Sequence, residues 1–265
     1  MKKTTVYDVP LRVFHWLFAL TFVVAFGIAK IVEDESPLFY YHILAGLFLG
    51  YLLLFRIIWG FIGTRYARFS SFRLHPPELL QYFRQLMGSG TRLYPGHNPA
   101  SSYSALAMFA LGGGLVVTGI LMAMGYKNDF FEDIHELLAN GFLLTVLLHL
   151  FGLIWHHLSH RDALYLSMIT GEKTTEDEAA GVARTWPVVG MLVVVLGIFW
   201  VGYLRAHYDE GTRTLRMFGL ELRAGEVEHE SESGADNEDE HEAQEEYEED
   251  DDEHEEEDED GLDAL

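Results

Sequence analysis

Two histidines, His135 and His149, lie fourteen residues apart in one apolar segment, IHELLANGFLLTVLLHLFGLIWHH. On an α-helix, fourteen residues rise about 21 Å and end about 40° short of four whole turns, so both imidazoles face the same side at two depths. Two further apolar segments carry His15 and His42. Because neutral imidazole is a common ligand of haem iron, the four histidines predict two bis-histidine haem sites and an electron-transfer protein.

The amino-acid composition restricts how haem could be attached to the chain. The chain has 265 residues, is 49% hydrophobic and contains no cysteine. A chain without cysteine cannot hold covalent c-type haem, a cysteine-ligated iron–sulfur cluster or a disulfide. The predicted cofactors are therefore two non-covalently bound haem b groups, with quinone as a further candidate. The net charge of -23 arises in residues 224–265, which hold 24 acidic residues and no Lys or Arg, so the remainder is near neutral.

Five apolar segments are long enough for spanning helices, which need roughly 17–25 residues each. They run over about 11–31, 41–62, 102–124, 134–157 and 187–204. The predicted fold is all-α: a polytopic transmembrane bundle with a four-helix haem-binding core, a fifth transmembrane helix and a disordered acidic tail. The expected divisions are a core over 1–174 with a cytoplasmic loop at 63–100, a linker and fifth helix over 175–223, and the tail over 224–265.

The distribution of charge predicts an orientation. Lys2, Lys3 and five arginines within 63–100 flank one set of helix ends, whereas the other loops are acidic. Positive loops stay in the cytoplasm, so we expect a multi-pass protein of the bacterial inner membrane with a cytoplasmic N-terminus and a periplasmic tail. The arginines after the fifth span oppose this orientation, but earlier loops usually dominate.

This orientation pairs the histidines by depth. His42 and His135 lie at the outer ends of their helices, and His15 and His149 lie toward the cytoplasmic side. For His42 or His135 alone, a polar residue reaching the interface is an equally good interpretation. Four such histidines together favour a role as cofactor ligands, because ionisable groups inside a membrane are energetically costly. His156 shares the face of His149, but it lies a full bilayer thickness from His135, so we expect it at the surface.

Two arginines lie at the depth of the inner pair. Arg12 precedes His15 by three residues, and Arg56 lies near the cytoplasmic end of the second span. Guanidinium groups suit haem propionates, although Arg12 is equally explained as a positive flank. Gly46 and Gly50 form a GxxxG pair near His42, which indicates either close helix contact or space for a flat macrocycle.

Five motifs occur in the order that one family shows: VYDVPLRVFHW, RIIWGFIGTRYARFSSF, YPGHNPAS, IHELLANGFLLTVLLHLFG and ALYLSMITGEK. Over about residues 6–174 the chain resembles the bacterial cytochrome b-561-like family, which includes the b-type subunit of nickel–iron hydrogenases. The resemblance implies a four-helix haem-binding membrane core that moves electrons among quinones, periplasmic redox proteins and partner subunits. It places the iron ligands at His15, His42, His135 and His149, and His97 in a loop motif without a ligand role.

Three functions stay open. The first is electron transfer between the quinone pool and a periplasmic redox partner, either a c-type cytochrome or a hydrogenase-like enzyme, with no catalytic residues and no nucleic acid involved. The second is a membrane anchor for a soluble redox enzyme. The third is a histidine-based metal transporter, which normally requires additional Asp, Glu or Cys ligands. The acidic tail is either a solvating segment or a tether for a cationic partner such as a basic c-type cytochrome.

Overall fold

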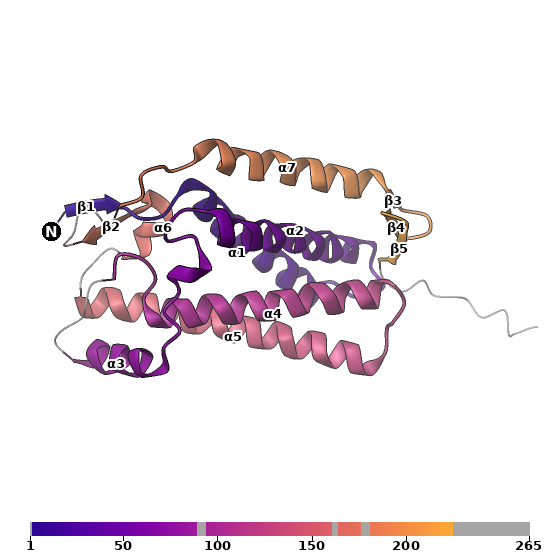
Figure 1. Ribbon diagram of the computed structural model, residues 1–265. Helices are drawn as coiled ribbons and strands as arrows, with labels where there is room; N and C mark the ends of the chain where they lie inside the picture. Colours follow the sequence, from indigo (N-terminus) through magenta and orange to yellow (C-terminus); the bar gives the residue numbers. More distant parts are fainter. Residues whose placement is uncertain (1, 89–93, 161–163, 176–180, 225–265) are drawn as a thin grey trace, which may run out of the picture. The chain divides into compact units, whose positions relative to one another are not determined.

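A computed structural model describes residues 2–88, 94–160, 164–175 and 181–224 (Figure 1). Apart from Ala224, the predicted disordered tail lies outside the described residues. Helices dominate the described part, and the few strands are at most four residues long. The predicted all-α class is confirmed.

In the described part, five helices are long and apolar enough to cross a membrane. They are α1 (Val9–Ile31), α2 (Tyr40–Ile62), α4 (Pro99–Ala123), α5 (Asp129–His160) and α7 (Pro187–Ala206). Each predicted span agrees with one of these helices, with end positions that differ by a few residues. The chain is therefore a multi-pass membrane protein.

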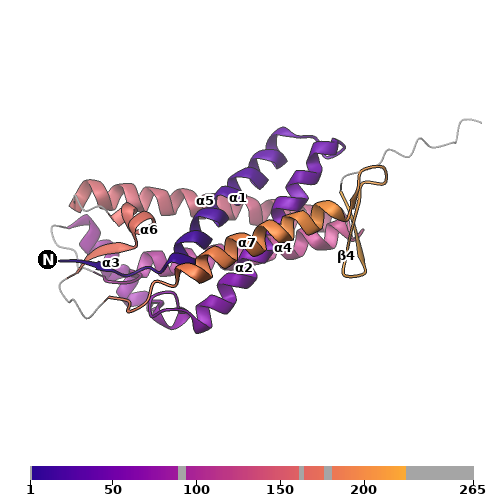
Figure 2. The same cartoon turned by 90° about the horizontal axis from the view of Figure 1, so that it is seen from above.

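The long helices associate in pairs. Helix α1 packs along α2, α4 packs along α5, and α2 contacts α4 to join the two pairs. The fifth helix, α7, runs along α1 and α2 (Figure 1, Figure 2). The histidine-bearing helices thus belong to a four-helix core, with α7 added to one side of it.

One end of the bundle, which we call the β1–β2 end, carries the N-terminal strand (Figure 1). Strand β1 (Lys2–Thr5) pairs antiparallel with β2 (Glu172–Thr175). The short helices here are α3 (Pro76–Met87), which lies within the 63–100 loop, and α6 (Ser167–Thr170). Three 3-10 turns complete the described helices: η1 (Pro37–Phe39), η2 (Phe69–Ser71) and η3 (Leu164–Leu166).

The opposite end, which we call the β3–β5 end, carries a small antiparallel sheet after α7. Its strands are β3 (Tyr208–Asp209), β4 (Thr214–Met217) and β5 (Leu220–Arg223). Phe218 and Gly219 form the β4–β5 turn with φ of 48° and 79°, as a two-residue hairpin requires. Leu215 and Leu222 are fully buried and cluster with Leu204 of α7, so this sheet covers the helix end.

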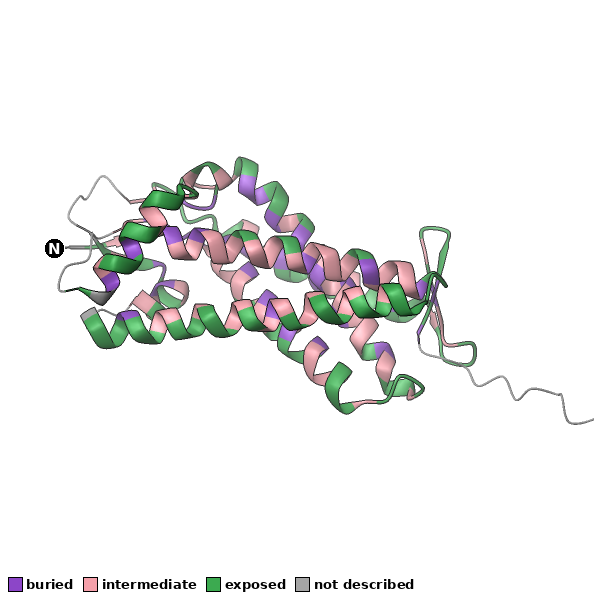
Figure 3. Cartoon of the chain, turned by 90° about the horizontal axis from the view of Figure 1, so that it is seen from below, coloured by how far each residue is buried: buried purple, intermediate pink, exposed green. Residues whose placement is uncertain are grey.

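Aromatic residues fill the interior of the core. Phe18 and Phe22 of α1 meet Phe142 of α5, with ring centroids 5.9 and 4.3 Å apart, and Phe14 packs against Phe18. Large apolar side chains are exposed along the outward faces of the spanning helices (Figure 3). A membrane supplies the apolar surroundings that such faces need.

Candidate haem-binding sites

The structure brings His42 and His135 together at the β3–β5 end. His42 lies in the first turn of α2 and His135 in the second turn of α5. Their ring centroids are 6.3 Å apart. Metal–imidazole nitrogen bonds are about 2 Å long, so rings bound on opposite sides of one metal ion have centroids roughly 6 Å apart. The distance between these two rings fits one iron held between them.

Both rings of this pair, which we call the outer pair after the predicted orientation, are oriented by hydrogen bonds at Nδ1. His42 Nδ1 lies 2.9 Å from the carbonyl oxygen of Ala25, which only accepts, so this nitrogen carries the proton. His135 Nδ1 lies 2.7 Å from Thr118 Oγ1, and Thr118 in turn donates to the carbonyl oxygen of Gly114 at 2.8 Å. Each ring is left with an unprotonated Nε2, as iron ligation requires, and such partners of ligand histidines tune metal affinity.

Glycines leave room beside the outer pair. Gly46 lies one turn from His42 on the same face of α2, and no atom lies within 4 Å of the position that a Cβ would take. Gly119 approaches His135, since a Cβ there would lie 3.4 Å from His135 Cε1. By contrast, a Cβ at Gly50 would meet Val116 of α4 at 3.1 Å. The two halves of the GxxxG pair therefore differ: Gly50 allows close helix contact and Gly46 leaves open space.

The second pair lies toward the β1–β2 end. His15 is in the second turn of α1, and His149 is fourteen residues beyond His135 on α5. Helices α1 and α5 meet near this level at Phe18 and Phe142, whose ring centroids are 5.9 Å apart. His15 Nδ1 is buried and has no hydrogen-bond partner. The structure thus places the predicted inner pair on two neighbouring helices, but it does not orient His15 through Nδ1 as it orients the outer histidines.

Arg56 lies in α2 toward the β1–β2 end, the end that also carries the inner pair, and it is buried, with 2% of its surface exposed. Its guanidinium carbon lies 4.8 Å from the ring centroid of Phe69 and 5.2 Å from that of Phe109. Its Nη1 has no hydrogen-bond partner. A buried guanidinium with an unused donor is costly without an anion, so Arg56 fits a haem propionate.

Arg12 is only partly available for the same role. Its Nη1 donates to the carbonyl oxygen of Ile169, which links α1 to α6. Its Nε is buried and has no partner. One face of this guanidinium is thus used for structure and the other is free to bind an anion.

Asp8 was not among the predicted site residues, although it organises this end. It is fully buried and accepts from Leu11 N at 2.9 Å, Trp59 Nε1 at 3.1 Å and Thr64 Oγ1 at 2.6 Å. It caps α1 and ties the start of α1 to the end of α2, which fixes His15 relative to Arg56. An Asp directly before a Val-Pro helix start is a capping signal that the sequence does show.

His156, which we expect at the depth of the membrane surface, is buried within the protein, with 8% of its surface exposed. Seven residues drift by only about 20° on a helix, so the inward face of α5 continues from His149 to His156. Lys30 and Lys127, the basic residues near the outer pair, form ion pairs with Glu136 and Glu132 at 3.6 and 3.9 Å.

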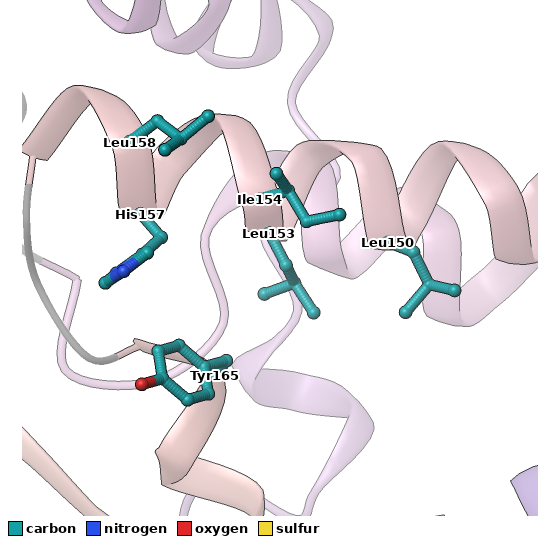
Figure 4. A pocket seen from close by; sticks show the side chains of 6 residues that line it. All are labelled: Leu150, Leu153, Ile154, His157, Leu158 and Tyr165. Carbon is teal, nitrogen blue, oxygen red and sulfur yellow. The ribbon is translucent and has the colours of Figure 1, made fainter.

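A shallow cavity of about 220 Å³ lies on the last turns of α5 (Figure 4). His157 and Tyr165 flank it, and their ring centroids are 5.2 Å apart. The rest of its lining is aliphatic: Leu150, Leu153, Ile154 and Leu158. The cavity combines an apolar wall with two side chains that hydrogen-bond, a combination that suits a lipophilic ring compound.

Comparison with known sequences agrees with this site. The family model described as prokaryotic cytochrome b561 matches residues 6–171. A probable Ni/Fe-hydrogenase B-type cytochrome subunit of Rhizobium leguminosarum bv. viciae is 25% identical over 213 residues, which covers 65% of this chain and 89% of the relative. The protein of the same name from Azotobacter vinelandii is 27% identical over 216 residues, with coverage of 65% and 89%.

No solved structure gives a significant match to the chain. The family match nevertheless spans α1 to α5 and all four histidines, and the predicted family is confirmed. The chain therefore belongs to the prokaryotic cytochrome b561 family and is a membrane b-type cytochrome that binds haem b and takes part in electron transfer.

Proposed function

We propose that the protein binds two haem b groups, one between His42 and His135 and one between His15 and His149, and conducts electrons between the two membrane faces. The observation that carries this proposal is the facing outer pair, with ring centroids 6.3 Å apart and both Nδ1 atoms engaged. In this assignment residues 1–174 form the haem-binding core, 175–223 add α7 and its sheet, and 224–265 form the acidic tail.

Haem b supplies reversible one-electron oxidation and reduction. The chain supplies the environment in which that chemistry runs. The four imidazoles hold the iron, and the aromatic core around Phe142 excludes water. Arg56 and Arg12 neutralise propionates at the inner site, because guanidinium groups bind carboxylates through directed hydrogen bonds.

The charges at the two ends support a cytoplasmic N-terminus in the bacterial inner membrane. Arginines at 65, 68, 73 and 84 follow α2 at the β1–β2 end. Acidic residues at 33–35 and at 129, 132 and 133 lie in or next to the loops at the other end. By the positive-inside rule, the outer histidine pair lies on the periplasmic side.

The names of the relatives support a redox enzyme of the nickel–iron hydrogenase type as the periplasmic partner. A basic c-type cytochrome is the alternative, because the 24 acidic residues of the tail attract cations and raise encounter rates. Deleting residues 224–265 should then slow electron exchange with a basic cytochrome at low salt. An unchanged rate at low ionic strength would rule out the tether.

The cavity on α5 supports a quinone as the membrane-side reactant. His157 lies eight residues beyond His149, about 12 Å along the helix. His157 and Tyr165 suit the carbonyl oxygens of a quinone head group, and the leucines suit its ring and tail. Quinol oxidation by the detergent-purified protein should fall in His157→Leu and persist in Leu196→Ala, a substitution at an exposed residue of α7.

The first test is a reduced-minus-oxidised optical spectrum of the purified full chain with haem quantified. We expect two b-type haems per chain, one lost in His42→Ala and the other in His149→Ala. The exposed His75→Ala should keep both haems. A single haem in the unsubstituted chain would reject the two-site assignment.

Two other functions, a membrane anchor and a metal transporter, can be distinguished from this proposal. A pure anchor would still assemble its enzyme partner after both His42→Ala and His149→Ala and would support the same electron flux. A metal transporter needs clustered ligands, and within the described residues no three His, Asp or Glu side chains gather in one place. Electron transfer through two haems is therefore the function that the geometry supports best.

A further inference from the structure

We propose that His97, together with Arg56, binds one propionate carboxylate of the inner haem, so that the 94–98 loop forms a wall of that site. This inference rests on the proposed function, since it assumes a haem between His15 and His149. It assigns a cofactor-binding role to a histidine in a loop between two spans, outside the four ligand positions.

His97 is buried although it belongs to a loop. Its side chain is 9% exposed, and its Nδ1 has no hydrogen-bond partner. The ring lies among the aromatic residues Phe72 and Tyr7, at centroid distances of 5.0 and 5.7 Å. A buried polar atom without a partner costs about 1–3 kcal/mol, which a ligand at this position would recover.

The loop is built to hold His97 in place. The carbonyl oxygen of Gly96 accepts from Lys173 Nζ at 2.6 Å and from Tyr7 OH at 3.4 Å. A Cβ at Gly96 would lie 2.3 Å from Tyr66 Cδ1, so only glycine fits against that ring. On the other side, Asn98 caps α4 by accepting from Ser101 N at 2.7 Å.

His97 and Arg56 share one aromatic cluster. The ring of Phe72, which contacts His97, lies 5.7 Å from the ring of Phe69 and 6.5 Å from that of Phe109. Those two rings enclose the guanidinium of Arg56. Arg56 Nη1 and His97 Nδ1 are thus two buried, unpartnered nitrogen atoms around the same group of rings.

The chemistry of these groups selects an anion with two acceptor atoms. Burial, followed by the charges of Lys173 and Arg56, lowers the pKa of His97 to about 3, so the ring is neutral at pH 7 and can present an N–H. Asp8 interacts electrostatically with Arg56, but its oxygens already accept from three other donors and leave Nη1 free. A carboxylate satisfies both nitrogen atoms, and a haem propionate is the carboxylate that the inner site would bring.

The test uses the full-length haem-loaded protein in detergent. The inner haem is identified as the one lost in His149→Ala, and its midpoint potential and rate of transfer to apomyoglobin are measured. We expect His97→Phe to lower the potential and to speed inner-haem loss by about ten- to a hundredfold, the effect of one hydrogen bond to a charged group. His97→Gln, which keeps a donor, should restore most of the retention, and the exposed His75→Phe should change nothing.

Coupling to Arg56 decides the assignment. If both residues bind one carboxylate, His97→Phe should add much less to the haem-loss rate in an Arg56→Gln background than in the native chain. The inference would be overturned if the two substitutions raised the haem-loss rate by independent factors that multiply in the double variant. It would also be overturned if the potential and loss rate of the inner haem were unchanged in His97→Phe. Either result would leave the two-haem proposal intact. Retention of the outer haem reports folding in each variant, and a native chain without an inner haem would overturn the proposed function itself.

Discussion

The two histidine pairs differ in how their imidazole rings are held by hydrogen bonds. At the β3–β5 end, His42 and His135 are both fixed through Nδ1 by acceptors on neighbouring helices, Ala25 of α1 and Thr118 of α4. At the β1–β2 end, His15 Nδ1 has no partner, and Arg56, buried toward the same end, also keeps an unused donor. The outer site is organised by the polypeptide, whereas the inner site is surrounded by groups that need a ligand to satisfy them.

This difference predicts distinct behaviour of the two haems. Ligands fixed before binding lose less rotational freedom when iron binds, so the outer site should hold its haem through the imidazoles. The inner site should depend more on propionate contacts from Arg56, Arg12 and His97. Substitutions near one pair should therefore leave the other nearly unchanged.

The largest effect should come from filling the space beside the outer pair. Gly46→Leu places a side chain where no atom lies within 4 Å, on the face that carries His42. If that space holds the macrocycle, overpacking costs about 3 kcal/mol and outer-haem binding weakens by about a hundredfold. Haem content per chain measures this. Gly202→Leu, at an equally open but exposed position on α7, is the control and should bind two haems.

Asp8→Asn should weaken the inner end. The amide cannot accept from all of Leu11 N, Trp59 Nε1 and Thr64 Oγ1, so a buried donor is left unsatisfied at a cost of about 2 kcal/mol. We expect a lower thermal midpoint and earlier loss of the inner haem on heating, followed by absorption spectroscopy. The exposed Asp209→Asn controls for loss of a carboxylate, and equal loss of both haems in Asp8→Asn would contradict a local role.

Thr118→Val tests the hydrogen bond that orients His135. Valine keeps the shape of threonine but removes the acceptor of the Nδ1 proton. Loss of such a partner typically lowers metal affinity by about tenfold or more, so outer-haem transfer to apomyoglobin should speed up by about that factor. Thr118→Ser restores the oxygen and should restore retention. If Thr118→Val changed only the inner haem, His135 would not be a ligand of the outer haem.

The sequence predicts the elements that follow from length and periodicity. Five apolar segments have the length of a membrane span, and the fourteen-residue spacing puts His135 and His149 on one face of α5. It does not predict the partner of His135, because Thr118 lies on another helix and meets the ring only after packing. It also misses β3 to β5, since strands of two to four residues leave too short a pattern.

The burial of His97 and His156 likewise could not be predicted from the sequence. The sequence predicts a loop position for His97 and a position at the depth of the membrane surface for His156, but it does not predict that both side chains are buried, because the contacts that bury them follow from no local pattern. Depth along a single helix can be derived from residue spacing alone. Which side chains surround a residue at that depth depends on how the loops return to the bundle, as residues 94–98 do through Lys173 and Tyr7.

The smallest effect should come from Gly119→Ala. The added methyl would lie 3.4 Å from His135 Cε1, an ordinary van der Waals contact that needs little movement of the ring. Because Thr118 still accepts from Nδ1, we expect both haems to remain bound and the outer-haem loss rate to change by about twofold at most. The outer midpoint potential should shift slightly, since the methyl displaces the imidazole without breaking its hydrogen bond, and Gly113→Ala, at an open position of α4, should not shift it. If Gly119→Ala instead released the outer haem as fast as Thr118→Val, the position of the ring rather than its hydrogen bond would control affinity at the outer site.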